Sequence, residues 1–134
     1  MKKEEIQQKA VLYQLLQKHL ENLRQQALQN EGRFLEIQTT RHALKDFGKA
    51  ETNTILVPLG NGVFADGQIT DTKKVLLEVG EGVLVKKTVT EANEMLDERE
   101  NQAKAVTGKL QVEIEQAVDQ INTIAMEIEQ ASKQ

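Results

Sequence analysis

Apolar residues recur at alternating steps of three and four from Ile6 to Leu44. Nine of the twelve positions in this series are apolar, and the exceptions are Lys9, Asn30 and Arg41. A heptad pattern held for more than five repeats predicts a coiled coil rather than an ordinary surface helix. Polar residues on such a seam lower stability but can fix the register of the helices, and local fraying is the alternative interpretation.

A second, mostly apolar stripe predicts a C-terminal helix that begins near residues 88–90, where a threonine can cap it. At 1.5 Å per residue, each of the two helices would be roughly 60 Å long. Two successive steps of four predict a stutter near residues 106–114, which would relax left-handed supercoiling. The stripe comprises Leu96, Arg99, Ala103, Val106, Leu110, Ile114, Ala117, Ile121, Ile124 and Ile128.

The charges of the two helical segments have opposite sign. Residues 1–50 contain nine basic and six acidic side chains, whereas residues 90–134 contain four basic and ten acidic ones. This difference favours packing of the two segments against each other as an antiparallel pair, because the middle of the chain must reverse its direction. The net charge of −4 argues against general binding to nucleic acid.

The middle of the chain has the composition of β-hairpins. Five of the eight glycines and the only proline lie between residues 58 and 82. Gly60-Asn61-Gly62 and Gly80-Glu81-Gly82 provide residues that tolerate positive φ and therefore predict two tight turns. The sequence thus predicts two hairpins, joined at 71–73, with strands at 54–59, 63–70, 74–79 and 83–89.

Apolar residues in these strands do not alternate cleanly with polar ones, so both faces of the hairpins would be apolar. An isolated hairpin is marginally stable, and exposed apolar strands pair with other chains. We therefore expect a mostly α, α+β fold: a long antiparallel coiled coil with two central β-hairpins that complete a β-barrel with other subunits. The predicted subunit interface comprises Leu56, Val57, Pro58, Leu59, Val75, Leu77, Val79, Val83 and Val85.

The order of these features resembles the prefoldin alpha subunit, whose plan is helix, two hairpins, helix. The beta class of that family has one hairpin, so two hairpins favour alpha. The resemblance covers residues 1–134 as a single domain, divided into 1–50, 54–89 and 90–134. The motifs that carry it are Leu56-Val57-Pro58-Leu59, Gly67, Asp71, Val75-Leu76, Val79-Gly80-x-Gly82, Val85 and Lys87-Thr88 before Ala92.

The resemblance implies a cytoplasmic molecular chaperone built from two alpha and four beta subunits. It implies an ATP-independent holdase that captures unfolded client proteins at the coiled-coil tips and delivers them to a group II chaperonin. A self-assembling prefoldin-like filament, or a structural coiled-coil tether, is the alternative function.

Several apolar residues near the two chain ends are not needed for pairing of the helices, which suggests a surface for unfolded clients. Flexible side chains such as Met and Leu adapt to varied partners. The alternative interpretation is a wider helix stripe that packs against a third partner, or scattered apolar residues that the surface tolerates. The predicted client-binding residues are Val11, Leu12, Leu15, Ile124, Met126 and Ile128.

The sequence contains little that predicts catalysis. Cysteine is absent, which excludes disulfides and thiol chemistry. His19 and His42 would lie roughly 30 Å or more apart along one helix, too far to share a metal ion. The acidic run at residues 94–100 is expected to be solvated, and the glycines at 60–67 do not form a phosphate-binding motif. We expect a non-enzyme without cofactor or metal, with neither a signal peptide nor a membrane span.

Overall fold

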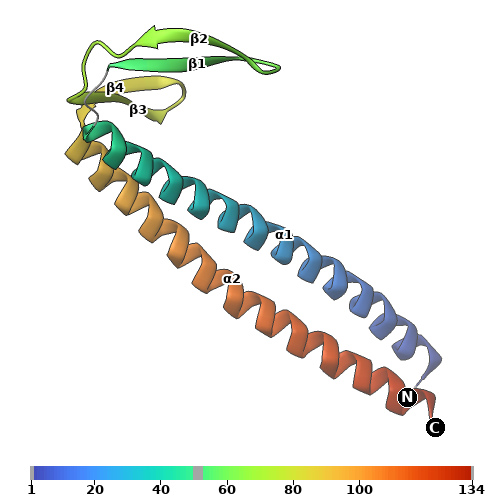
Figure 1. The fold of residues 1–134 in the computed structure, drawn as a ribbon. Coiled ribbons are helices and arrows are strands. Elements are labelled where there is room, and N and C mark those ends of the chain that lie inside the picture. Colours follow the sequence, from blue (N-terminus) through green and yellow to red (C-terminus); the bar gives the residue numbers. More distant parts are fainter. Residues whose placement is uncertain (1, 50–52, 134) are drawn as a thin grey trace. The chain divides into compact units, whose positions relative to one another are not determined.

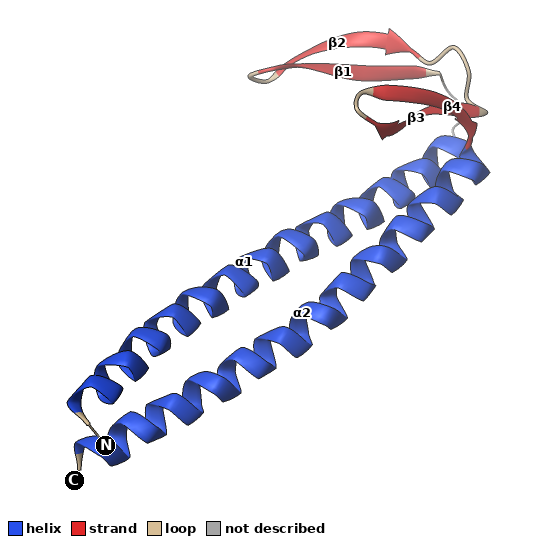
Figure 2. Cartoon of the chain, turned by 180° about the vertical axis from the view of Figure 1, so that it is seen from behind, coloured by secondary structure: helices blue, strands red, loops and turns tan. Residues whose placement is uncertain are grey.

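The computed structural model describes residues 2–49 and 53–133. Its elements follow the predicted order of helix, two hairpins and helix (Figure 1), which confirms the predicted mostly α, α+β architecture of the chain itself. Met1, Ala50 and Gln134, which belonged to the expected helical ranges, lie outside the described residues. The elements are α1 (Lys3–Gly48), β1 (Thr54–Gly60), β2 (Val63–Gln68), β3 (Lys74–Gly80), β4 (Val83–Thr88) and α2 (Val89–Ser132), coloured by type in Figure 2.

The chain forms two compact units. The first, here called the outer helix pair, contains α1 up to Phe34 and α2 from Gln102 onward. The second, here called the hairpin unit, contains residues 35–101 and therefore both hairpins and the remaining turns of the helices.

The apolar seam holds the outer helix pair together. Leu23, Leu110 and Ala117 form its buried cluster, and partly buried neighbours pack against them. Along the whole of α1, all twelve predicted seam positions are buried or half-buried, as expected for the side of a helix that faces its partner. The heptad prediction for α1 is therefore confirmed.

The prediction for the middle of α2 is wrong. Val106 is 45% exposed, and all six residues from Lys104 to Lys109 are exposed, whereas Ala103 and Leu110 are buried. Thr107 faces α1, because its hydroxyl accepts a hydrogen bond from Asn30. The positions of α2 that face α1 are therefore 103, 107, 110 and 114, which are regular heptad steps. The predicted stutter does not exist, because a polar threonine rather than the neighbouring valine occupies the seam.

Two of the polar seam residues have matched partners across the outer helix pair. Lys9 Nζ lies 2.5 Å from Glu127 Oε2. Asn30 Nδ2 donates to the carbonyl oxygen of Ala103 at 2.9 Å and to Thr107 Oγ1 at 2.8 Å. Since a shift of one helix along the other would separate these groups, they favour a single register, which supports the register interpretation over fraying.

The two hairpins form separate two-stranded antiparallel sheets. β1 pairs with β2 from Thr54↔Gln68 to Gly60↔Val63, with a register shift just before the turn. The three turn residues from Gly60 to Gly62 have φ values of 117°, 50° and 81°, and those from Gly80 to Gly82 have 135°, 50° and 75°. Glycine suits such positions because it has no Cβ to clash in this conformation. The predicted hairpin turns are confirmed.

A capping box begins α2. The Glu91 N–H donates to Thr88 Oγ1, and the Thr88 N–H donates to Glu91 Oε1, both at 3.1 Å. Two backbone donors that would lack helical partners are thereby satisfied. The expected threonine cap is Thr88. It connects the last strand of the second hairpin directly to the helix.

Replacing Asn30, a polar residue of the seam, by an apolar residue should stabilise the outer helix pair. Asn30→Leu adds a half-buried apolar side chain, and we expect a gain of roughly 1 kcal/mol in the free energy of unfolding. Thermal unfolding followed by circular dichroism measures this change. Gln29→Leu is the matched control, because Gln29 is exposed and should give no gain. A variant at position 30 that is no more stable than the wild type would contradict the seam assignment.

The cap should weaken in acid. Hydrogen bonds from Thr88, first from its backbone N–H and then from its side chain, lower the pKa of Glu91 below its ordinary value. Because the folded pKa is the lower one, the cap is fully stabilising above the unfolded carboxyl pKa of about 4.3 and is lost as the pH falls through the lowered value. Carboxyl NMR titration of Glu91 and amide exchange at residues 90–93 measure this loss.

Glu91→Gln is the control for that experiment, since the amide does not titrate and should remove the acid dependence of exchange in the first turn of α2. A Glu91 carboxyl that titrates at or above its ordinary value would refute the prediction.

Candidate functional site

The hairpins expose a large apolar surface, here called the hairpin surface. Of the eighteen exposed large hydrophobic residues in the described parts of the chain, ten lie on the hairpins, with exposed fractions of 39–67%. So many exposed apolar side chains on two separate two-stranded sheets mark an interaction surface. Its residues are Ile55, Leu56, Val57, Leu59, Val63, Phe64, Leu76, Val79, Val83 and Leu84.

The predicted interface residues divide into two groups. Leu56, Val57, Pro58, Leu59, Val79 and Val83 are exposed. Val75, Leu77 and Val85, on one face of the second hairpin, are half-buried within the chain and are less available to a partner. The prediction missed five exposed residues whose apolar character inside a strand was the only signal: Ile55, Val63, Phe64, Leu76 and Leu84.

Gly67 belongs to the packing of the first hairpin. A Cβ at this position would lie 3.0 Å from Val57 Cγ2 and 3.4 Å from Ile55 Cγ1. The missing side chain therefore leaves room for these two strand β1 residues to lie across β2. This close approach gives a physical reason for a glycine at this place in the strand.

A second apolar surface lies in the outer helix pair, where the start of α1 runs beside the end of α2 (Figure 1). Val11, Leu12, Leu15 and Met126 are 45–60% exposed, and we call these four residues the tip surface. The two other predicted client-binding residues, Ile124 and Ile128, are half-buried and belong to the heptad series of α2. The structure thus places four of the six predicted residues at the surface.

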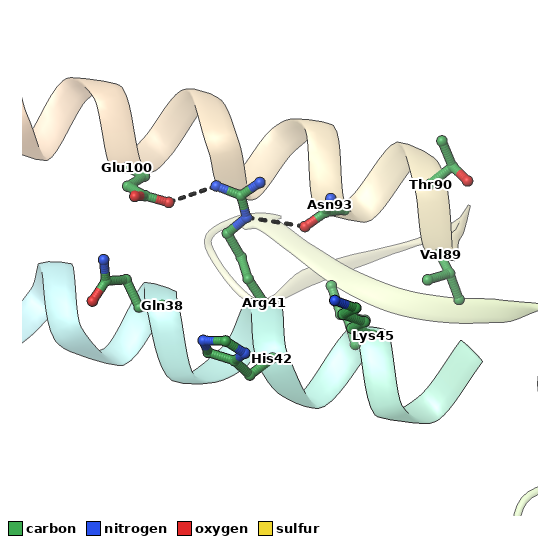
Figure 3. Close-up of a pocket in the computed structure, with 9 residues that line it drawn as sticks. Gln38, Arg41, His42, Lys45, Val89, Thr90, Asn93 and Glu100 are labelled. Atoms are coloured by element: carbon green, nitrogen blue, oxygen red, sulfur yellow. Dashed lines mark hydrogen bonds and ion pairs between the residues drawn. The ribbon is translucent and has the colours of Figure 1, made fainter. Parts of the chain in front are cut away.

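A polar cluster joins the two helices within the hairpin unit (Figure 3). Arg41 Nε donates to Asn93 Oδ1 at 3.0 Å, and Arg41 Nη1 donates to Asp97 Oδ1 at 3.0 Å and to Glu100 Oε2 at 2.6 Å. The hydrogen bond to Glu100, with the charges of both carboxylates, outweighs desolvation and raises the pKa of Arg41. Arg41, the third polar residue of the seam, therefore also has a partner on α2, namely the buried Glu100.

Arg99, which the sequence suggested for the seam, has a different role. Its Nη2 donates to the carbonyl oxygen of Glu78 at 2.9 Å, so it links α2 to the end of β3. The neighbouring Glu100 occupies the buried position instead. The prediction chose the wrong one of two adjacent charged residues.

Open cavities lined by both α1 and α2 lie along the described helices. One, of about 520 Å³, lies beside the Arg41 cluster and is lined by polar side chains that include Gln38, His42 and Lys45. Another, of about 460 Å³ in the outer helix pair, has a partly apolar lining that includes Ala27 and Phe34.

Within residues 2–49 and 53–133, no group of three or more metal-ligating side chains comes together. Over the same part of the chain, no helix combines the length and apolar character that crossing a bilayer requires.

Comparison with known proteins identifies the fold. The solved structure of filamentous PFD from Methanocaldococcus jannaschii is similar, with a TM-score of 0.74 and 17% sequence identity over 90% of this chain and 98% of that chain. At this identity the similarity supports the fold alone. None of the curated protein sequences matches the chain.

The family model for prefoldin subunits matches residues 16–134, which is most of the chain. This match includes α1 from Leu16 onward, both hairpins and α2. Prefoldins are a family of non-enzymatic, chaperone-type proteins. The chain therefore belongs to the prefoldin family, as a prefoldin subunit.

Proposed function

We propose that this chain is an alpha-class prefoldin subunit that acts as an ATP-independent holdase. In this proposal residues 1–134 work as one prefoldin-like domain: the hairpins assemble the complex and the coiled coil captures unfolded proteins. The observation that carries the proposal is the hairpin surface. Ten large apolar side chains exposed on marginal two-stranded sheets require partner chains to cover them.

The partners in this proposal are beta-class subunits, two copies of this chain joining four of them. The second hairpin supports the alpha assignment, because the beta class carries one hairpin. Completing a barrel would pair the outer edges of the hairpins, since each described hairpin strand has one strand neighbour.

Clients are proposed to bind at the tip surface. Unfolded chains offer apolar segments of no fixed sequence, and exposed Leu, Val and Met side chains adapt to such segments without a shaped pocket. Ile124 and Ile128 would contribute through their remaining exposed area. The complex would act in the cytoplasm and pass its clients to a group II chaperonin. It would need no cofactor and carry out no catalysis.

A self-assembling filament is the second candidate. The observation that favours it is the similarity to a PFD described as filamentous. A chain with two hairpins also has two separate surfaces that can join different neighbours, which is the requirement for an open assembly.

Removing the apolar groups of the tip surface should abolish client protection without affecting assembly. We expect Val11→Ser, Leu12→Ser and Leu15→Ser, combined in one variant, to lose most of the ability to suppress aggregation of a chemically unfolded protein in the absence of ATP. Light scattering measures the aggregation, and the mass of the complex confirms assembly. Gln14→Ser, at an exposed position between them, is the control. Full protection by the triple variant would eliminate the tip surface as the client site.

Mass measurement should separate the two candidate functions. A subunit of the hexamer should form a complex with the mass of a hexamer only when a one-hairpin beta-class chain is added. A filament former should give a ladder of growing masses by itself. In either case Leu56→Ser with Leu76→Ser should reduce assembly strongly, because it removes two exposed apolar groups. A wild-type chain that stays a folded monomer with and without the partner would refute assembly through the hairpins.

A further inference from the structure

The two hairpins are structural duplicates offset by 20 residues. Each residue pair of the first hairpin has a counterpart 20 positions later in the second, from Thr54↔Gln68 and Lys74↔Thr88 to Gly60↔Val63 and Gly80↔Val83. The register shifts before the turns and the positive φ values of the turn residues also correspond. The two hairpins therefore present the same backbone surface twice in one chain.

The apolar groups on one face also correspond. Leu56 and its counterpart Leu76 are 66% and 62% exposed, and Phe64 and its counterpart Leu84 are 58% and 57% exposed. Cross-strand partners and alternate residues share a face, so each of these pairs lies on the same face of its hairpin. Since all four side chains are more than half exposed, the described part of the chain covers neither face.

The charge on this face is reversed between the duplicates. Opposite Leu56 stands Asp66, whereas opposite Leu76 stands Lys86. Asp66 is the only ionisable residue between positions 53 and 69. The second hairpin carries four lysines and two glutamates over residues 73–88, and the Glu78 carboxylate accepts a hydrogen bond from the Gly82 N–H of its own turn. One hairpin is thus acidic and the other is basic.

We propose that the face of the first hairpin docks on the matching face of the second hairpin in another copy of this chain, with Asp66 and Lys86 selecting this pairing. Packing the two faces together would place the cross-strand pair of Leu56 and Asp66 against the cross-strand pair of Leu76 and Lys86. Pairing of like hairpins would instead place two aspartates or two lysines together, which costs free energy as solvent is excluded. The proposal rests on the assembly through hairpins described above, in which strand edges pair, and adds which hairpin faces meet between two copies of this chain.

This pairing permits two assemblies. If both hairpins of one copy join the same second copy, the contact closes as a two-fold dimer. If they join different copies, the assembly grows as an open chain. Both outcomes contain the same contact.

Charge reversal with rescue tests the proposal. Sedimentation velocity on the full-length chain measures self-association at low and at high salt. We expect Asp66→Lys and Lys86→Asp each to weaken self-association about tenfold or more at low salt. The double reversal should restore it to near the wild-type value, and so should mixing the two single variants. High salt should reduce the differences, because exposed charges are screened.

Lys18→Asp and Glu21→Lys serve as matched controls, since both residues are exposed on α1, and neither should change self-association. Circular dichroism establishes that each variant is folded. Single reversals without effect, or a double reversal without rescue, would overturn the pairing, and so would a wild-type chain that is monomeric at all concentrations.

The failure of the pairing can be told apart from failure of the proposed function. If Leu56→Ser with Leu76→Ser disrupts assembly but the charge reversals do not, the hairpins still assemble the complex and only the charge selection is wrong. If assembly with a beta-class partner is also unaffected by the serine variant, the assembly role of the hairpins is wrong.

Discussion

The structure depends on a limit of the two-stranded sheet: a hairpin has two faces and no second layer of its own with which to cover both. In this chain the hairpins carry more than half of the exposed large hydrophobic residues in the described structure. A compact domain would bury such residues in its own core, whereas here they remain at the surface. The function of a prefoldin subunit, which is to be one part of an assembly, follows from this imbalance.

The helices, unlike the hairpins, cover their apolar residues within the chain. Their apolar seam is covered by the opposite helix, and the polar interruptions of the seam are matched across it. Lys9 meets Glu127, Asn30 meets Thr107, and Arg41 meets Glu100. Apolar contacts alone would tolerate sliding by a heptad, whereas these specific pairs do not. Stability and register therefore come from different residues of the same seam.

The accuracy of the sequence predictions followed the range of the interactions involved. The heptads of α1 and the two glycine turns were predicted correctly, because they depend on local periodicity and on local backbone preferences. The errors came at α2, where Thr107 and Glu100 hold the seam positions that the prediction had given to Val106 and Arg99. A polar residue is recognised as part of a seam only when its partner on the other helix is known.

The sequence by itself determined that this chain makes two long helices around two hairpins, since repeat length, turn glycines and strand composition act within a few residues of one another. Only the tertiary structure decided which polar groups meet across the helices. It also decided that Asp66 and Lys86 stand at equivalent points of the two hairpins, because the register of each strand pair sets which residues lie opposite each other. The reason is physical: burial and pairing depend on groups distant in the chain, and their spacing in the sequence does not contain that information.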